Sequence, residues 1–221
     1  MSNTIINWSD KIGKKYKTNK FGINKKLHIQ NLFRGIIISP SNGGKTNLVF
    51  EIIASSPNIY GHLHIIARNP DQELYNYLKD KLKGSITIYD SNNPPSVDDI
   101  EKMTEPQLVI IDDYSNDKNL QKNIFSHYFT RGRHKNLSTL FLSHSYFAGC
   151  DKMIRLNSEY VMILKANSKR DLQMILKDFN IPNVDEKKLI EAYNYATKDK
   201  GQMLLVDCVN QQLRKNFNEV L

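Results

Sequence analysis

The sequence predicts an α/β fold in which a mainly parallel central β-sheet is flanked by helices. From Leu32 onward, strand-like apolar segments alternate with helix-like segments, a pattern typical of a parallel sheet covered on both faces. One β-branched run, residues 36–38, enters a turn that ends in Gly-Lys-Thr, and a later apolar run ends in two aspartates. With 221 residues, 40% hydrophobic and 24% charged, the chain suits one globular domain with a sizeable core.

The predicted elements follow these runs in order. Strands are expected where apolar and β-branched residues cluster, at residues 33–39, 62–67, 85–89, 108–112, 138–143, 160–166 and 202–208. Helices are expected between them, at residues 45–55, 71–83, 118–130, 169–178 and 185–197. The segment 90–105 contains Asn92-Asn93-Pro94-Pro95 and is expected to be a loop with a short helix.

The turn after the first strand has the outline of a phosphate-binding loop, or Walker A motif. In such a loop, backbone N–H groups at a helix N-terminus surround the β-phosphate, a lysine reaches the β/γ oxygens, and a Thr hydroxyl ligates Mg²⁺. The motif is imperfect because Ser39 stands where the pattern has glycine, so an ordinary strand–turn–helix junction is the alternative. The expected ligands are ATP or GTP with Mg²⁺, and the expected binding residues are Ser41, Asn42, Gly43, Gly44, Lys45, Thr46 and Asn47.

The second apolar run resembles a Walker B segment. Four apolar residues, 108–111, read as a strand buried on both faces and are followed by Asp112 and Asp113. Asp112 would hold Mg²⁺ together with Thr46, because Mg²⁺ prefers hard oxygen ligands and keeps several waters. Asp113 would polarise the attacking water. A core strand that ends in a solvated acidic turn is the alternative interpretation.

Lysines are concentrated at the N-terminus. Residues 1–30 contain seven lysines and one acid, Asp10, so they carry +6 of the chain's net charge of +8. This predicts a basic N-terminal arm at 1–30 that precedes a P-loop ATPase domain at 31–221. With Trp8, Tyr16 and Phe21 among the lysines, the arm could contact phosphates and stack on bases, or it could be a solvated leader without a special role.

Other compositional features narrow the class of protein. No apolar run approaches the length of about 18 residues that a membrane span needs, and no secretory signal is evident at the N-terminus. Cys150 and Cys208 lack metal-ligand spacing, so free thiols in a reducing intracellular compartment are expected.

A family resemblance extends from about residue 33 to residue 208. After the Walker motifs, a basic Arg131-Gly132-Arg133-His134 turn leads into a buried strand that ends in Ser143-His144-Ser145, and segments 154–161 and 200–207 follow. In this order the motifs resemble the HerA–FtsK superfamily of P-loop DNA translocases, of RecA-like (ASCE) type. The likeness is greatest to viral genome-packaging ATPases of the poxvirus-like, virophage and Polinton type.

The resemblance implies further site residues. The strand beside Walker B would carry a polar sensor of the γ-phosphate at its tip; the family usually has Gln there, and this chain offers His144 or Ser143. An arginine from a neighbouring subunit would stabilise charge during phosphoryl transfer. The candidates are Arg133 and Arg155 first, then Arg131.

The resemblance also implies partners and place. A trans-acting arginine requires an oligomer, and the family implies a hexameric or pentameric ring around double-stranded DNA, bound through its phosphates without sequence preference. Capsid proteins are a further partner class, and no membrane is expected. The expected location is intracellular, in the cytoplasm or virus factory of an infected cell, or on the virion.

Two other functions fit parts of the sequence. A P-loop nucleoside or nucleotide kinase shares the phosphate loop, but no lid insertion or Asp-Arg pair is evident. A non-catalytic nucleotide- or DNA-binding module would explain Ser39 and His144 as marks of a site that has lost turnover. Stimulation of ATP turnover by a nucleoside monophosphate or by DNA, or the absence of turnover, separates these possibilities from a motor.

Overall fold

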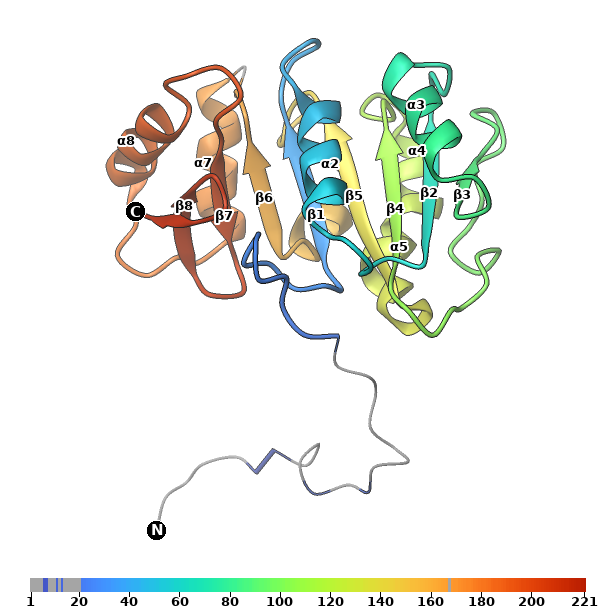
Figure 1. The fold of residues 1–221 in the computed structure, drawn as a ribbon. Coiled ribbons are helices and arrows are strands. Elements are labelled where there is room, and N and C mark those ends of the chain that lie inside the picture. The colour runs from blue at the N-terminus through green and yellow to red at the C-terminus, as the bar shows by residue number, and fades with distance from the viewer. Residues whose placement is uncertain (1–5, 8–10, 12, 14–20, 167) are drawn as a thin grey trace.

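A computed structural model describes residues 6–7, 11, 13, 21–166 and 168–221 of the chain. These residues form one nine-stranded sheet in the order β3-β2-β4-β5-β1-β6-β7-β8-β9 (Figure 1). The strands are β1 (Arg34–Ile38), β2 (His62–Ala67), β3 (Ile86–Ile88), β4 (Gln107–Asp112), β5 (Leu137–Ser143), β6 (Tyr160–Ile163), β7 (Leu204–Asp207), β8 (Gln212–Lys215) and β9 (Glu219–Val220).

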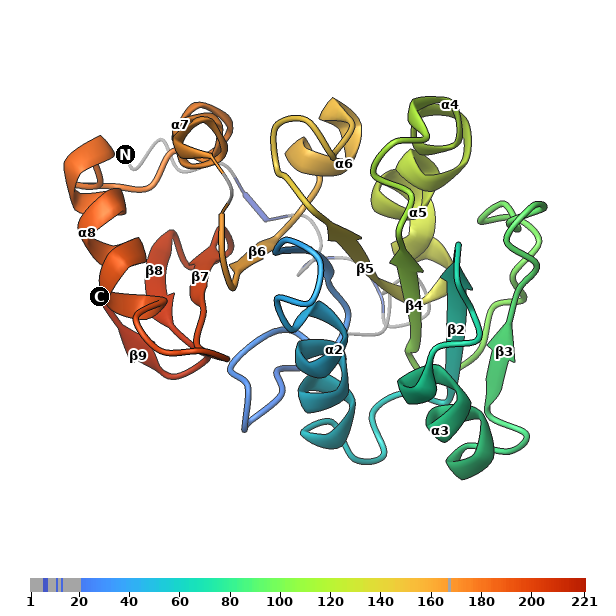
Figure 2. The ribbon, with the colours of Figure 1, turned by 90° about the horizontal axis from the view of Figure 1, so that it is seen from above.

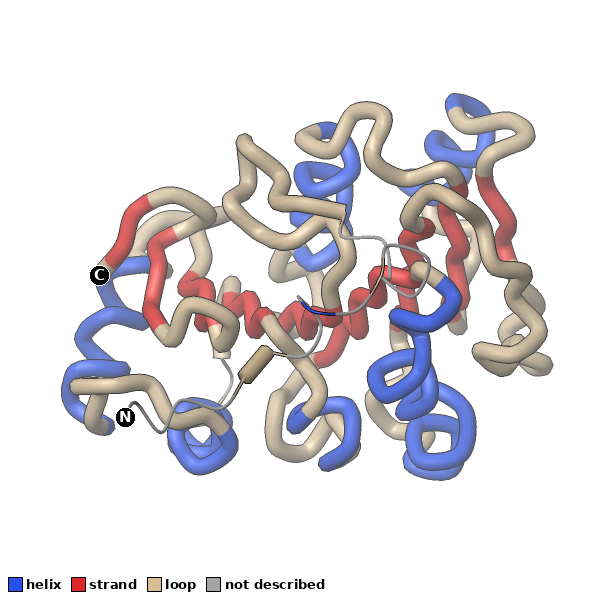
Figure 3. Tube along the Cα trace, turned by 90° about the horizontal axis from the view of Figure 1, so that it is seen from below, coloured by secondary structure: helices blue, strands red, loops and turns tan. Residues whose placement is uncertain are grey.

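Helices cover both faces of this sheet. They are α2 (Lys45–Ala54), α3 (Glu73–Lys81), α4 (Lys118–Leu120), the π-helical segment η2 (Gln121–Phe125), α5 (Ser126–Arg131), the 3₁₀ segment η3 (Gly132–Lys135), α6 (Lys152–Leu156), α7 (Lys169–Asp178) and α8 (Glu186–Ala196). Helices α2 and α3 lie on one face, and the helices from α4 to α7 lie on the other (Figure 2). Seen from below, the strands form a central row between the two helical layers (Figure 3).

Six neighbouring strands, from β3 to β6, are parallel, as the alternation of segments predicts. The remaining pairs, from β6·β7 to β8·β9, are antiparallel. Because parallel strands all end at the same edge, the chain leaves β1, β2, β4 and β5 at the upper edge in Figure 1. In open α/β sheets the ligand site lies at this carboxyl edge.

Two apolar cores flank the sheet, because successive side chains of a strand point to opposite faces. On β1, Ile36 and Ile38 belong to the core under α5 to α8, and Ile37 belongs to the core under α2 and α3. Every residue of β4 and β5 is buried, as expected for central parallel strands. Two of the strands that lead into the site, β4 and β5, are therefore fully enclosed.

The structure confirms the predicted α/β class, and it differs from the sequence prediction in four places. The helix expected at 118–130 is interrupted by a π-helical turn, η2, and the short helix expected within 90–105 is replaced by turns. The short helix α6 and the antiparallel strands β8 and β9 were not predicted. Elements of two to five residues are too short to show the periodicity on which sequence prediction depends.

Part of the predicted basic arm lies outside the described residues, namely Trp8, Tyr16 and lysines 14, 15, 17 and 20. Within the described part, Leu27 and Ile29 are buried in the core under α2. Asn24 donates its side-chain amide to the Ser55 carbonyl at 3.0 Å, which ties residues 21–30 to the end of α2. The division at residue 30 stays a prediction. In the part of the chain that the structure describes, no helix combines the length and apolar character that crossing a bilayer requires.

Candidate active site

The loop between β1 and α2 has the backbone conformation of a tight phosphate-binding turn. Asn42 and Gly44 have φ values of 59° and 96°, in the left-handed region that glycine tolerates best. A Cβ atom on Gly43 would lie 1.8 Å from the Ser39 Oγ, so glycine is required there. The Ser39 side chain thus occupies space that the glycine leaves open, which explains how the loop accommodates serine at the first glycine position of the motif.

Lys45, the first residue of α2, is folded back over this loop. Its Nζ donates to the Ser39 carbonyl at 2.9 Å and to the Pro40 carbonyl at 3.2 Å, and lies 3.3 Å from the His144 Nδ1. Burial lowers the pKa of Lys45, and the negative charges of Asp112 and Asp113 oppose that shift. The ammonium is therefore the positive charge around which the polar groups of the site are arranged.

Asp112 ends β4 and is 6% exposed. Its Oδ2 accepts a hydrogen bond of 2.7 Å from the Tyr75 hydroxyl and one of 3.4 Å from the Gln72 amide, both provided by the segment after β2. Burial raises the pKa of Asp112, while the Tyr75 hydrogen bond and the Lys45 charge act in the opposite direction. Because Ala67 and Asp112 are paired in register, the chain after β2 passes directly beside this carboxylate.

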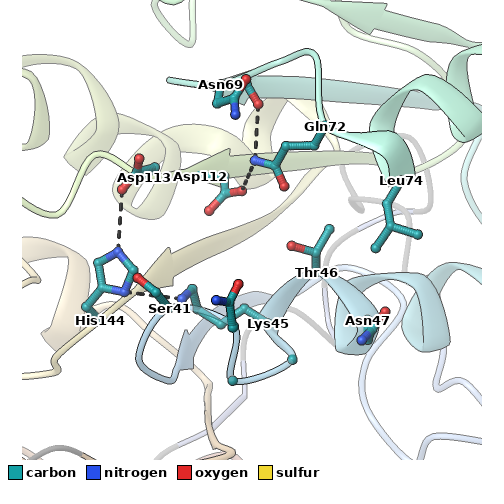
Figure 4. A pocket seen from close by; sticks show the side chains of 13 residues that line it. Ser41, Lys45, Thr46, Asn47, Asn69, Gln72, Leu74, Asp112, Asp113 and His144 are labelled. Carbon is teal, nitrogen blue, oxygen red and sulfur yellow. Dashed lines mark hydrogen bonds and ion pairs between the residues drawn. The ribbon is translucent and has the colours of Figure 1, made fainter.

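Asp113 turns away from the sheet. Its φ of 64° places it in the left-handed region, which Asp adopts more readily than most residues. Its Oδ1 lies 3.5 Å from the Nε2 of His144, which follows β5 (Figure 4). His144 thus joins Lys45 through one ring nitrogen and Asp113 through the other. A neutral ring with its proton on Nε2 satisfies both contacts, because Lys45 can only donate and a carboxylate can only accept.

These side chains line one cavity of about 460 Å³ (Figure 4). The predicted residues that line it are Ser41, Asn42, Gly43, Gly44, Lys45, Thr46, Asn47, Asp112, Asp113 and His144. Sequence reasoning missed Asn69, Gln72 and Leu74, which also line it. Their only signal in the sequence is that they follow a strand that ends at the same edge of the sheet as β4.

The three predicted arginines do not line this cavity. Arg131, at the end of α5, forms an ion pair of 3.2 Å with Asp98, and Arg133 is exposed in η3. Both precede β5 and therefore lie at the amino edge of the parallel strands, opposite the phosphate loop. Arg155 is mostly buried, and its Nε donates to Asp178 at 2.8 Å.

An arginine that sequence reasoning missed lies beside the site. Arg68 follows β2, its guanidinium stands 4.5 Å from the centre of the Tyr114 ring, and it forms an ion pair of 2.5 Å with Asp117. Together with Asp113 it lines a second cavity that adjoins the first. Arg68 therefore anchors the loop that follows Asp113 to the end of β2.

A buried glutamine joins the two loops that carry Asp113 and His144. Gln121, in η2, is fully buried, and its Nε2 lies within 3.0 Å of the carbonyls of Tyr114, Ser115 and Gly149. Its Oε1 accepts from the Asp151 N–H at 2.7 Å. The loops after β4 and β5 are thus held at a fixed separation.

The donor set at the cavity fits a magnesium–nucleotide pair. The amino-terminal N–H groups of α2 have no partner within the helix and face the loop, which favours an anionic group. The Thr46 hydroxyl and the Asp112 carboxylate are hard oxygen donors of the type that Mg²⁺ prefers. Among the described residues no cluster of three or more His, Cys, Asp or Glu side chains could hold a metal by itself, so the remaining ligands would be phosphate and water.

Comparison with solved structures shows the same fold. The genome packaging NTPase B204 from Sulfolobus turreted icosahedral virus 2, in complex with AMP, matches with a TM-score of 0.61 at 12% identity, over 85% of this chain and 98% of that chain. Its complex with ATP-gammaS matches with a TM-score of 0.58 at 12% identity, over 87% and 100% of the two chains. The cytoplasmic domain of the Thermomonospora curvata type VII secretion ATPase EccC matches with a TM-score of 0.55 at 11% identity, over 85% of this chain and 25% of that one.

Comparison of sequences gives the family. No curated protein matches the chain. The family model described as Poxvirus A32 protein matches residues 19–215, which confirms the poxvirus-type resemblance noted in the sequence. Since that match spans nearly the whole chain, the protein belongs to the Poxvirus A32 protein family.

Proposed function

We propose that the protein is an ATPase that drives viral DNA packaging. The observation that carries this proposal is the convergence of Lys45, Asp112, Asp113 and His144 on one cavity at the phosphate loop, in a chain of the Poxvirus A32 family. B204, which has the same fold, is a genome packaging NTPase whose structures include a complex with ATP-gammaS.

The phosphate loop and Asp112 would hold the nucleotide and its metal. The backbone of residues 43–46 would receive the β-phosphate, Lys45 would neutralise phosphate charge, and Thr46 with Asp112 would hold Mg²⁺. When bound, the ion would supply electrostatic stabilisation of the phosphoryl group. The hydrogen bonds from Tyr75 and Gln72 fix the Asp112 carboxylate in one orientation, as outer contacts of a metal ligand commonly do.

Asp113 and His144 would act on the attacking water. Asp113 is about half exposed and faces the cavity, so its carboxylate is free to accept a proton from water. The His144 ring lies between Asp113 and Lys45, where it can orient that water and respond to the loss of a phosphate. Asp113 after β4 and His144 after β5 would thus act on the same water molecule.

Arg131 and Arg133 suit a role between subunits. Both are exposed and lie at the edge of the sheet opposite the phosphate loop, so within one subunit they are remote from the nucleotide. In a ring they could contact a neighbour's nucleotide or the phosphates of double-stranded DNA. Arg155 is a weaker candidate because its side chain is only 11% exposed and its guanidinium is held by Asp178 and by the Cys150 carbonyl. Capsid proteins are the expected docking partners.

The decisive experiment measures Mg²⁺-dependent ATP hydrolysis across a titration of double-stranded DNA, with the oligomeric state followed in the same samples. Wild type should hydrolyse ATP faster as DNA is added, and Lys45→Ala should abolish the activity. Lys187→Ala is a matched control, because this lysine is 85% exposed on α8. Stimulation by a nucleoside monophosphate would indicate a kinase instead, and nucleotide binding without turnover in any assembly state would indicate a non-catalytic module.

A further inference from the structure

We infer that Asp171, in the first turn of α7, is a positioning residue that holds His144 toward the phosphate loop. This inference rests on the proposed function, because it adds a residue to the machinery of the same site. Asp171 is only 1% exposed. Among the described residues, none that lines the cavity around Lys45 comes from α7. Asp171 therefore acts through the loop after β5 and not on the nucleotide.

The Asp171 carboxylate binds two donors from the chain that follows His144. Its Oδ1 accepts from the Ser145 hydroxyl at 2.7 Å and from the Phe147 N–H at 2.8 Å. The Ser145 Oγ in turn accepts from the Ala148 N–H at 3.1 Å. One carboxylate oxygen of α7 thus fixes the turn that begins directly after His144.

On its other side, His144 is tied to the loop that carries Asp113. The Ser143 hydroxyl donates to the Ser145 carbonyl at 2.8 Å, and its oxygen lies 3.0 Å from the Oγ of Ser115, two residues after Asp113. Ser143 and Ser115 are both buried. His144 therefore stands between two anchored serines, and the direction of its ring depends on both anchors.

The loop closes tightly around these serines. The Gly149 N–H donates to the Ser145 carbonyl at 3.1 Å. A Cβ atom on Gly149 would lie 2.1 Å from the Ser143 Oγ and 2.5 Å from the Ser145 carbonyl oxygen. Because the backbone packs directly against both serines, a displacement of Ser145 is passed on to Ser143 and to His144 between them.

A buried carboxylate at position 171 is costly for the stability of α7. The Asp171 Oδ2 is buried and has no hydrogen-bond partner among the described residues. Burial of a charged group with unused hydrogen-bonding capacity is unfavourable, and natural proteins retain such local costs mainly at functional sites. An apolar side chain would avoid this cost but could not accept from Ser145. The carboxylate therefore serves the loop that carries His144.

The first test compares two substitutions of Asp171 in DNA-stimulated ATP hydrolysis. Asp171→Asn keeps an oxygen that can accept both hydrogen bonds, whereas Asp171→Ala removes it. We expect Asp171→Ala to lower kcat about tenfold with KM for ATP within about twofold, and Asp171→Asn to retain kcat within about threefold. Ile175→Ala is the matched control, because it removes a fully buried apolar side chain from the same helix and should leave kcat unchanged. Equal kcat in wild type and Asp171→Ala, or an equal loss in Ile175→Ala, would overturn the inference.

The second test asks whether Asp171 acts through His144. In a His144→Ala background, Asp171→Ala should change kcat by less than about twofold, because the side chain that it positions is gone. An undiminished tenfold loss in that background would overturn the inference. Ser145→Ala cuts the same hydrogen bond from the side of the loop and should lower kcat about threefold. Unchanged kcat in Ser145→Ala would refute the role of Asp171 even if Asp171→Ala does not fold.

A measurement without hydrolysis separates this inference from the proposed function. Hydrogen exchange reports on the Phe147 N–H, which donates to Asp171. Asp171→Ala should speed exchange within residues 144–149 by about tenfold or more, and Asp171→Asn and Ile175→Ala should not. That result in a protein that never hydrolyses ATP would support the inference and contradict the proposed ATPase alone. Normal hydrolysis by wild type, with unchanged exchange in Asp171→Ala, would contradict only the positioning role.

Discussion

The two aspartates that end β4 are adjacent in the chain but differ in environment. Asp112 is buried and accepts hydrogen bonds from Tyr75 and Gln72, whereas Asp113 is left-handed, about half exposed and directed at His144. A carboxylate fixed by donors suits a metal, and one that reaches water suits proton transfer. The change of backbone conformation between them is what separates the two environments.

Asp113→Asn should lower kcat for ATP hydrolysis by about 100-fold or more, because the amide cannot accept the proton. Nucleotide affinity should change only a few-fold. Asn tolerates the left-handed backbone nearly as well as Asp, so the fold should persist. The measurement is steady-state hydrolysis together with ATP binding, and Asp80→Asn on the exposed side of α3 is the control. Unchanged kcat in the site variant would remove Asp113 from the mechanism.

His144 gives a second prediction at the same scale. The glutamine amide has both N–H donors and an acceptor oxygen, so His144→Gln can preserve the contacts to Asp113 and Lys45, whereas His144→Ala removes both. We expect His144→Gln to retain hydrolysis within a few-fold and His144→Ala to lose about 100-fold in kcat. Parallel kcat and KM measurements on the two variants test this. Near-wild-type activity in both would mean that hydrolysis does not depend on the contacts of residue 144 to Asp113 and Lys45.

Single elements fix the distances between these residues. The π-helical segment η2 places Gln121 where its side chain reaches the loops after β4 and β5 at once. Such segments are uncommon and often occur at functional sites. A regular α-helix over the same residues would rotate the side chains that follow by part of a turn. The π-helical turn of η2 therefore helps to set the positions of the side chains at the site.

Gln121→Leu should destabilise the protein by about 2–4 kcal/mol, because it removes the side-chain hydrogen bonds to the Ser115 and Gly149 carbonyls and to the Asp151 N–H. Urea unfolding measures the change. The control is Lys122→Leu, which makes a similar substitution at the next, exposed position of the same segment and should change stability by less than about 0.5 kcal/mol. Equal effects of the two substitutions would show that the hydrogen bonds of Gln121 contribute little.

The sequence indicated those parts of the site that are local in the chain. The phosphate loop and the pair Asp112 and Asp113 are contiguous motifs, and His144 follows a strongly apolar strand. The contribution of Tyr75 was not predictable, because it depends on the register of β2 with β4 and on the position of α3. The same reason applies to the buried pair of Asp207 and Arg214, which joins the predicted strand β7 to β8, a strand of four residues that the sequence did not reveal.

At the scale of the whole molecule, the two ends of the parallel strands carry different groups. The carboxyl edge holds the phosphate loop, both aspartates and His144. The amino edge holds Arg131 and Arg133, which are exposed and precede β5. A subunit that presents a nucleotide at one edge and exposed guanidinium groups at another is suited to a ring in which each subunit completes its neighbour's site.

Mixed assemblies test that arrangement directly. Neither Lys45→Ala nor Arg133→Ala should hydrolyse ATP alone, since the first lacks the phosphate contact and the second lacks the group supplied to its neighbour. In an equimolar mixture, about a quarter of the interfaces would pair an intact Lys45 with an intact Arg133, so DNA-stimulated hydrolysis should reappear at a fraction of the wild-type rate. The same mixing with Arg131→Ala tells which of the two arginines acts.

Arg155→Ala serves as the contrast. It leaves Asp178 without its ion pair, so it should lower stability, and mixing should not restore its activity. If Arg133→Ala and Arg131→Ala both hydrolyse ATP normally by themselves, the arginines at the amino edge contact DNA or solvent instead, and the catalytic site is complete within one subunit.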